Sequence, residues 1–122
     1  MLQSLRPIAL ASALCLAASA PAFAHAHLKA STPAPGASVA APGEIDLAFT
    51  EGVNPKFTGL SLSGPGGAPV STGPARLGAG GDATLVVPVA GPLAPGAYKV
   101  DWHALATDGH RTEGSFSFTV RP

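Results

Sequence analysis

The sequence predicts an all-β domain, a single Greek-key β-sandwich or barrel of about seven strands. Three observations support this. Apolar and polar residues alternate with a period of two in several short runs, which is typical of half-buried strands. The 15 glycines and 13 prolines of the 122-residue chain cluster between these runs, as turn residues do. No stretch after residue 24 carries the apolar stripe of an amphipathic helix.

The clearest strand candidates are "EIDLAFTE", "AYKVDWHA" and "GSFSFTV", in which every second residue is apolar. We expect these apolar side chains to face the core: Ile45, Leu47, Phe49, Tyr98, Val100, Trp102, Phe116, Phe118 and Val120. Weaker candidates are "ATLVVPV", "FTGLSLS" and residues 27–30, and Pro88 indicates a sheet edge or a bulge. Residues 63–81 predict a loop with one short strand around Val70.

Residues 1–24 predict a secretory signal peptide. Arg6 precedes the apolar run "IALASALCLAASA", and the small-residue triplet "AFA" follows it. The run is shorter than the roughly 20 residues of a membrane-spanning helix, so we expect no stable membrane insertion. Cleavage after Ala24 would leave a mature domain of residues 25–122 in the periplasm. The single cysteine, Cys15, would leave with the signal, so a metal site could not use thiolate.

The charge balance of the mature domain excludes some partners. Removal of Arg6 from the seven Lys and Arg residues leaves six, against seven Asp and Glu. A near-neutral chain without a basic stripe argues against nucleic acid or an anionic membrane surface as a partner.

His25 would become the first residue of the processed protein. Its free α-amino group and its ring Nδ1 could then close one chelate ring on a metal, whereas in the precursor the same nitrogen belongs to a peptide bond. The alternative is that His25 merely follows a processing site, where residue choice is loose.

A second candidate is the tripeptide Asp108-Gly109-His110, between two predicted strands. Glycine permits a tight turn, so the carboxylate and the imidazole can converge on one point. The alternative is an ordinary Asp-Gly turn with a solvated histidine. Together with His25, the two side chains would supply an amine, two imidazoles and a carboxylate, a donor set that suits Cu²⁺.

The mature chain resembles the CopC family of periplasmic copper-resistance proteins in "HAHLKASTPAPGA", "EIDLAFTE", "PLAPGAYKVDW" and "DGHRTEGSFSFTV". The resemblance implies a cupredoxin-like barrel or sandwich and a high-affinity Cu²⁺ site built from His25, Asp108 and His110. It also assigns Glu51 a weak axial contact or an outer hydrogen-bonding role. Some family members carry a methionine-rich loop for monovalent copper. The corresponding loop here, "SGPGGAPVSTGPARLGAGG", has no sulfur or histidine, so we expect no such site.

The other two histidines are weighed separately. His-Ala-His at a free terminus could bind copper through the amine, two deprotonated amides and the ring of His27, without any fold. We favour the folded site, because that alternative takes the terminus out of any sheet and leaves Asp108 and His110 unused. His27 could instead approach the metal or orient a ligand. We expect His103 to be a solvated residue on a strand, with its side chain facing away from that of Trp102.

Three functions follow from these residues. The favoured one is a non-catalytic periplasmic copper protein, a monomer or weak dimer, for buffering, resistance or delivery to an inner-membrane transporter of the CopD type. The second is a histidine-brace copper monooxygenase. The third is a metal-free immunoglobulin-like structural module.

Overall fold

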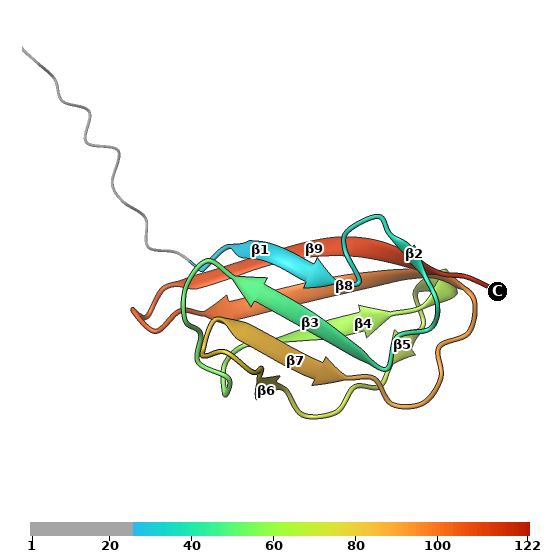
Figure 1. Cartoon of the computed structure of the whole chain (residues 1–122). Coiled ribbons are helices and arrows are strands. Elements are labelled where there is room, and N and C mark those ends of the chain that lie inside the picture. Colours follow the sequence, from blue (N-terminus) through green and yellow to red (C-terminus); the bar gives the residue numbers. More distant parts are fainter. Residues whose placement is uncertain (1–25) are drawn as a thin grey trace, which may run out of the picture.

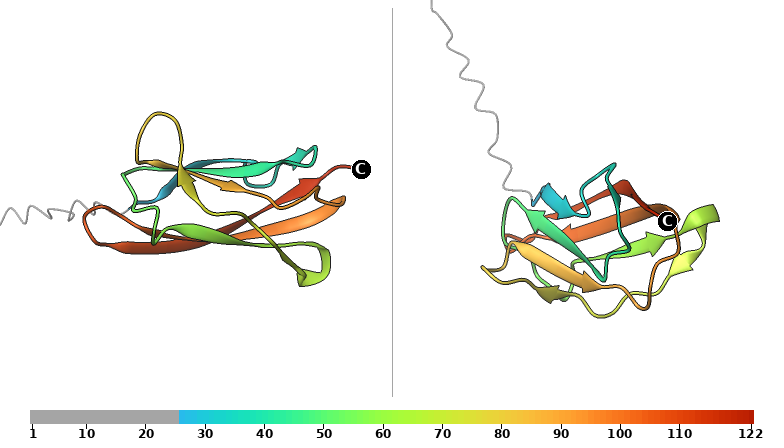
Figure 2. Two further views of the ribbon diagram at one scale, coloured as in Figure 1. Left: turned by 90° about the horizontal axis from the view of Figure 1, so that it is seen from below. Right: turned by 45° about the vertical axis from the view of Figure 1, so that its right-hand side comes forward.

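The computed structural model describes residues 26–122, which form two β-sheets packed face to face (Figure 1). The four-stranded sheet contains, in spatial order, β1 (Leu28–Thr32), β3 (Glu44–Phe49), β7 (Thr84–Pro88) and β6 (Arg76–Leu77). The five-stranded sheet contains β2 (Ser38–Val39), β9 (Arg111–Val120), β8 (Gly96–Leu105), β4 (Gly59–Ser63) and β5 (Pro69–Val70). Figure 2 shows the two layers edge-on. Neither sheet closes on itself, so the predicted all-β fold is confirmed as a sandwich rather than a barrel.

The strands that the sequence predicts most clearly are the longest or most deeply buried strands of the structure. β8 and β9 form a hairpin of two ten-residue strands, paired from Gly96 with Val120 to Leu105 with Arg111. The weaker candidates correspond to β7, β4 and β1, and the short strand around Val70 is β5. Pro88 ends β7 beyond the residues that pair with β6, where its missing N–H costs no ladder bond to that strand.

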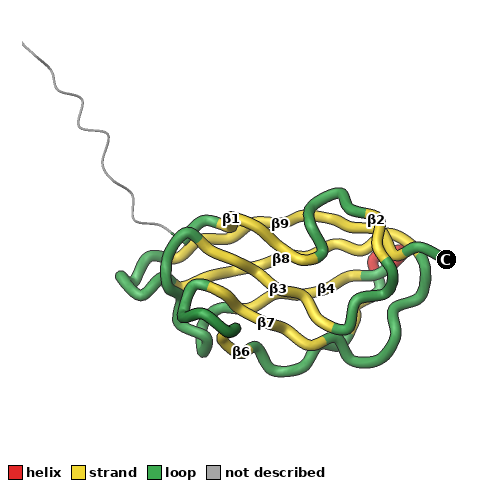
Figure 3. Tube along the Cα trace, viewed as in Figure 1, coloured by secondary structure: helices red, strands yellow, loops and turns green. Residues whose placement is uncertain are grey.

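Two strands were not predicted, and one pairing differs from the expected antiparallel pattern. β2 and β6 are two residues long, too short to show a period (Figure 3). β2 pairs with the end of β9 in parallel, with Ser38 opposite Thr119. The loop expected over residues 63–81 contains β5, β6 and the 3₁₀ turn η1 (Pro65–Gly67).

The core lies between the sheets and contains the predicted apolar face. All nine side chains expected to face inward are at most 9% exposed. Phe49 of one sheet meets Trp102 of the other edge to face, with ring centroids 5.5 Å apart. Gly114 stands opposite Trp102 in the β8–β9 register, where a Cβ atom would lie 2.6 Å from the indole ring. The bulky indole therefore requires glycine on the neighbouring strand.

The segment between β3 and β4 closes one end of the sandwich. Val53 forms a bridge with Ala106, the Asn54 N–H donates to the carbonyl of Leu105 at 2.8 Å, and the Thr107 N–H donates to the carbonyl of Gly52 at 3.0 Å. This segment is thereby held against the β8–β9 turn. Within residues 26–122, no helix is long and apolar enough to span a membrane.

Candidate metal centre

The β8–β9 turn carries Asp108 and His110. The Ala106 N–H donates to the carbonyl of His110, and the Gly109 N–H donates to the carbonyl of Ala106, both at 2.9 Å. Gly109 has a φ of +93°, a conformation that a residue with a side chain rarely adopts. The glycine between the two candidate ligands therefore makes the tight turn possible, as the sequence predicted.

The two side chains meet within this turn. Asp108 Oδ1 accepts the backbone N–H of His110 at 3.0 Å, and Asp108 Oδ2 lies 3.1 Å from His110 Nδ1. The His110 side chain is 60% exposed and that of Asp108 33%. The structure thus presents an imidazole and a carboxylate side by side on an accessible tip of the molecule, which confirms that these two residues converge.

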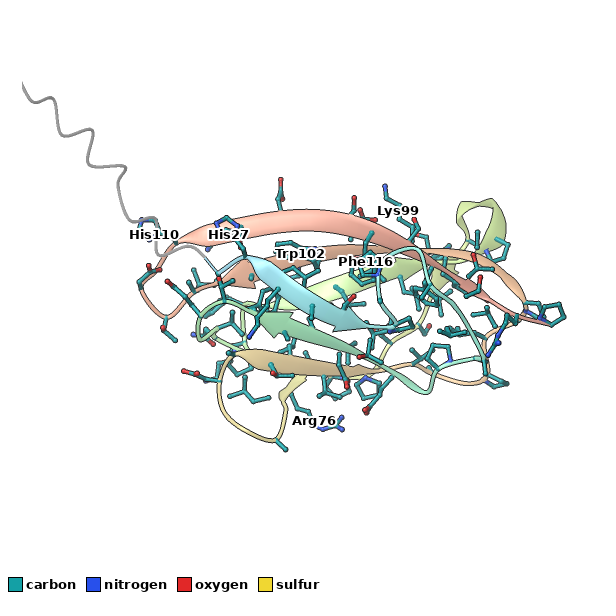
Figure 4. The ribbon with its side chains drawn as sticks, turned by 45° about the horizontal axis from the view of Figure 1, so that its top comes forward. His27, Arg76, Lys99, Trp102, His110 and Phe116 are labelled. Atoms are coloured by element: carbon teal, nitrogen blue, oxygen red, sulfur yellow. The ribbon has the colours of Figure 1, made fainter. Side chains whose placement is uncertain are left out.

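The start of the described chain lies beside this turn. Ala26 is fully buried, and its carbonyl accepts a hydrogen bond of 2.7 Å from the hydroxyl of Thr112, two residues after His110. Figure 4 shows His27 and His110 at the same end of the sandwich. His25, the cleavage site after Ala24 and the predicted signal peptide lie outside the described residues.

The remaining candidates surround the turn at different positions. His27 is exposed, and its N–H donates to the hydroxyl of Thr50 at 3.0 Å. Glu51 is half-buried in the segment that packs against the turn. Among residues 26–122, no three His, Cys, Asp or Glu side chains gather closely enough to hold a metal ion by themselves.

His103 takes the place predicted for it. It is exposed on the outer face of the five-stranded sheet, while the neighbouring Trp102 is buried. It lines an open hollow of about 400 Å³ together with Phe57, Arg111 and Glu113.

Two threonines near the turn were not singled out from the sequence. Thr50 and Thr112 hold the chain at Ala26 and His27. The sequence pattern could have identified Thr112, because counting back by twos from Phe116 places this polar residue on the inward-facing side of its strand. Thr50 carried no comparable signal.

The fold and the exposed pair define a small β-sandwich protein with candidate metal ligands at one end. The CopC domain matches residues 28–121, so the chain belongs to the CopC domain family and the resemblance seen in the sequence is confirmed. The matched region contains Asp108, His110 and Glu51 and begins after His25 and His27.

Three relatives illustrate the family. Protein YobA of Escherichia coli strain K12 is 44% identical over 100 residues, 81% of each chain. Copper resistance protein C of Pseudomonas syringae pv. tomato is 41% identical over 108 residues, 84% of this chain and 86% of the relative. The crystal structure of PcoC, a methionine-rich copper resistance protein from Escherichia coli, is 37% identical with a TM-score of 0.74, covering 80% of this chain and all of that one.

Proposed function

We propose that this chain is an exported, non-catalytic protein that binds Cu²⁺ through His25, Asp108 and His110. The signal peptide of residues 1–24 is removed in the periplasm, and His25 contributes its α-amino group and its ring. The observation that carries the proposal is the meeting of Asp108 with His110 beside the anchored Ala26. Ala26 directly follows His25 in the sequence, so the anchored residue is the chain neighbour of the proposed amino-terminal ligand.

The donor chemistry supports copper in the divalent state. Two imidazoles, an amine and a carboxylate supply nitrogen and oxygen ligands, which suit Cu²⁺, whereas Cu⁺ prefers the sulfur of cysteine and methionine. The only cysteine and the only methionine of the chain, Cys15 and Met1, lie in the proposed signal peptide. PcoC is described as methionine-rich, so this chain differs from that relative in the ligands it can offer.

The position of the site supports a role in buffering and transfer. Asp108 and His110 lie on an exposed turn, where a bound ion can be exchanged with another protein without unfolding the sandwich. Copper resistance protein C, the name of one relative, fits a role in limiting copper toxicity. We propose delivery to an inner-membrane transporter of the CopD type as the second part of this role, with the chain acting as a monomer or weak dimer.

The carboxylate favours this role over a copper monooxygenase. Asp108 brings a negative charge to the metal, which stabilises Cu²⁺ relative to Cu⁺ and occupies a position that oxygen chemistry would need open. Glu51 and His27 remain candidates for a weak axial contact or for orienting a ligand.

Electron paramagnetic resonance tests the proposal on protein that begins at His25 and carries one equivalent of Cu²⁺. We expect a tetragonal spectrum with coupling to nitrogen, altered in both Asp108→Ala and His110→Ala. His103→Ala is the matched control, because His103 is an exposed histidine on the same hairpin. A spectrum unchanged in both ligand variants would overturn the proposed site.

A further inference from the structure

One peptide group near the start of the described chain is held from both sides. The carbonyl oxygen of Ala26 accepts a hydrogen bond from Thr112 Oγ1 at 2.7 Å. The N–H of His27, in the same peptide group, donates to Thr50 Oγ1 at 3.0 Å. The carbonyl and N–H of a trans peptide point in opposite directions, so the two hydroxyls grip this group from opposite sides.

The two threonines come from different sheets. Thr50 directly follows β3 of the four-stranded sheet, and Thr112 is the second residue of β9 in the five-stranded sheet. The peptide between Ala26 and His27 therefore joins the two layers. We call Thr50 and Thr112 the threonine clamp.

Further contacts reinforce this arrangement. The Thr50 N–H donates to the carbonyl of His27 at 2.9 Å, so Thr50 contacts His27 through both its backbone and its side chain. The Ala26 residue is fully buried among the core side chains. Packing and hydrogen bonds thus fix the backbone at two successive residues.

The inward-facing position of Thr112 shows what its hydroxyl contributes. The side chain is half-buried on the face of β9 that otherwise carries Phe116, Phe118 and Val120. A valine of nearly the same shape would fill that space, but it could not donate a hydrogen bond. The hydroxyl of Thr112 therefore serves the hydrogen bond to the carbonyl of Ala26 and is not needed to fill the core.

We infer that the threonine clamp positions the amino-terminal metal ligand, an inference that rests on the proposed function. His110 is the last residue before β9, and Thr112 is the second residue of that strand. The residue that holds Ala26 thus lies two positions after one of the proposed ligands. A terminus held this way loses less conformational entropy when it binds a metal. It therefore binds the metal more tightly. Thr50 and Thr112 are positioning residues and need not touch the ion.

The first experiment measures the clamp without metal. Amide hydrogen exchange at His27 in metal-free protein beginning at His25 should accelerate in Thr50→Val, which removes the acceptor of that N–H. Thr119→Val, at an exposed position on β9, should leave the exchange unchanged. Equal exchange at His27 in the native protein and Thr50→Val would overturn the clamp.

The second experiment measures Cu²⁺ affinity by competition with a chelator, at a temperature where every variant is folded. Thr112→Val should weaken binding on the order of 10–100-fold, as is typical for residues that orient metal ligands. Thr112→Ser, which keeps the hydroxyl, should restore most of the affinity, and Thr119→Val should match the native protein. Native affinity in Thr112→Val would overturn the inference, whereas failure of the native protein to bind Cu²⁺ would overturn the proposed function instead.

A double-mutant cycle separates positioning from general stabilisation. One extra methionine before His25 abolishes the free amine of that residue. If Thr112 acts by placing His25, Thr112→Val should weaken Cu²⁺ binding much less in the extended protein than in the protein that begins at His25. An equal loss in both backgrounds would contradict a positioning role.

Discussion

Asp108 contacts His110 at two points, through the backbone N–H at 3.0 Å and through ring Nδ1 at 3.1 Å. The same carboxylate thus touches both the backbone and the ring of His110. An ionised carboxylate has about four lone-pair positions, so it can keep the contact with the backbone N–H and still offer an oxygen to a metal. In the proposed site Asp108 therefore both holds the backbone of His110 and donates an oxygen.

The Asp108→Asn variant tests the charge of this residue. The amide keeps the shape of the side chain and an oxygen that can accept the His110 N–H, but it removes the negative charge. We expect Cu²⁺ affinity to fall by roughly 10–100-fold. Asp108→Ala should bind more weakly still, because it also loses the orienting contact. Competition titration measures both, and native affinity in Asp108→Asn would argue against an ionised ligand.

Variants of His27 and His110 distinguish the folded site from the amino-terminal motif, in which His-Ala-His at the free terminus binds copper without any fold. If the folded site is right, His110→Ala removes a coordinating nitrogen and should cost more than about 100-fold in Cu²⁺ affinity, a larger loss than for an orienting residue. His27→Ala should leave most of the affinity. The amino-terminal motif predicts the reverse order, so ranking the two dissociation constants decides between the sites.

The available ligands predict selectivity for the oxidised ion. Without cysteine or methionine beyond residue 24, nitrogen and oxygen ligands should hold copper as Cu²⁺ and give a low reduction potential. Reduction of the loaded protein under anaerobic conditions, with a chelator specific for Cu⁺ present, should transfer the metal to the chelator. Retention of Cu⁺ against a moderate chelator would require a soft site that this account does not contain.

A prediction about stability comes from Asp46 on β3. One oxygen of its carboxylate is buried and, within residues 26–122, has no hydrogen-bond partner. Burial, and next the negative charge of Glu44, raise the pKa of this carboxyl above its ordinary value of 3.8. The folded protein then binds the proton more tightly than the unfolded chain, so Asp46 favours folding at pH values below 3.8. That contribution is lost as the pH rises through the folded pKa.

Asp46→Asn removes this titration. We expect a higher thermal unfolding midpoint than the native protein at pH 7, with the difference shrinking or reversing at pH 3. Asp101→Asn, on the exposed face of β8, serves as the control. A variant that is equally destabilised at both pH values would show that the Asp46 carboxylate stabilises the fold through another contact.

The sequence predicted the sandwich because the long strands bury every second residue, and that pattern is visible locally. β2 and β6 escaped prediction since two residues cannot display a period, and the parallel pairing of β2 with β9 depends on contacts between segments about 80 residues apart. The meeting of Asp108 with His110 was predictable from the glycine between them. The anchoring of Ala26 by Thr112 was not, because it joins residues that only the folded topology brings together.

The central claim is that Cu²⁺ is held by the free terminus of His25 together with the Asp108–His110 turn. Competition titration of Cu²⁺ into two proteins, one beginning at His25 and one with a single methionine before it, tests this claim most directly. We predict that the extended protein binds more than about 100-fold more weakly, since it lacks a ligand and not merely an orienting contact. Equal dissociation constants for the two proteins would contradict the claim.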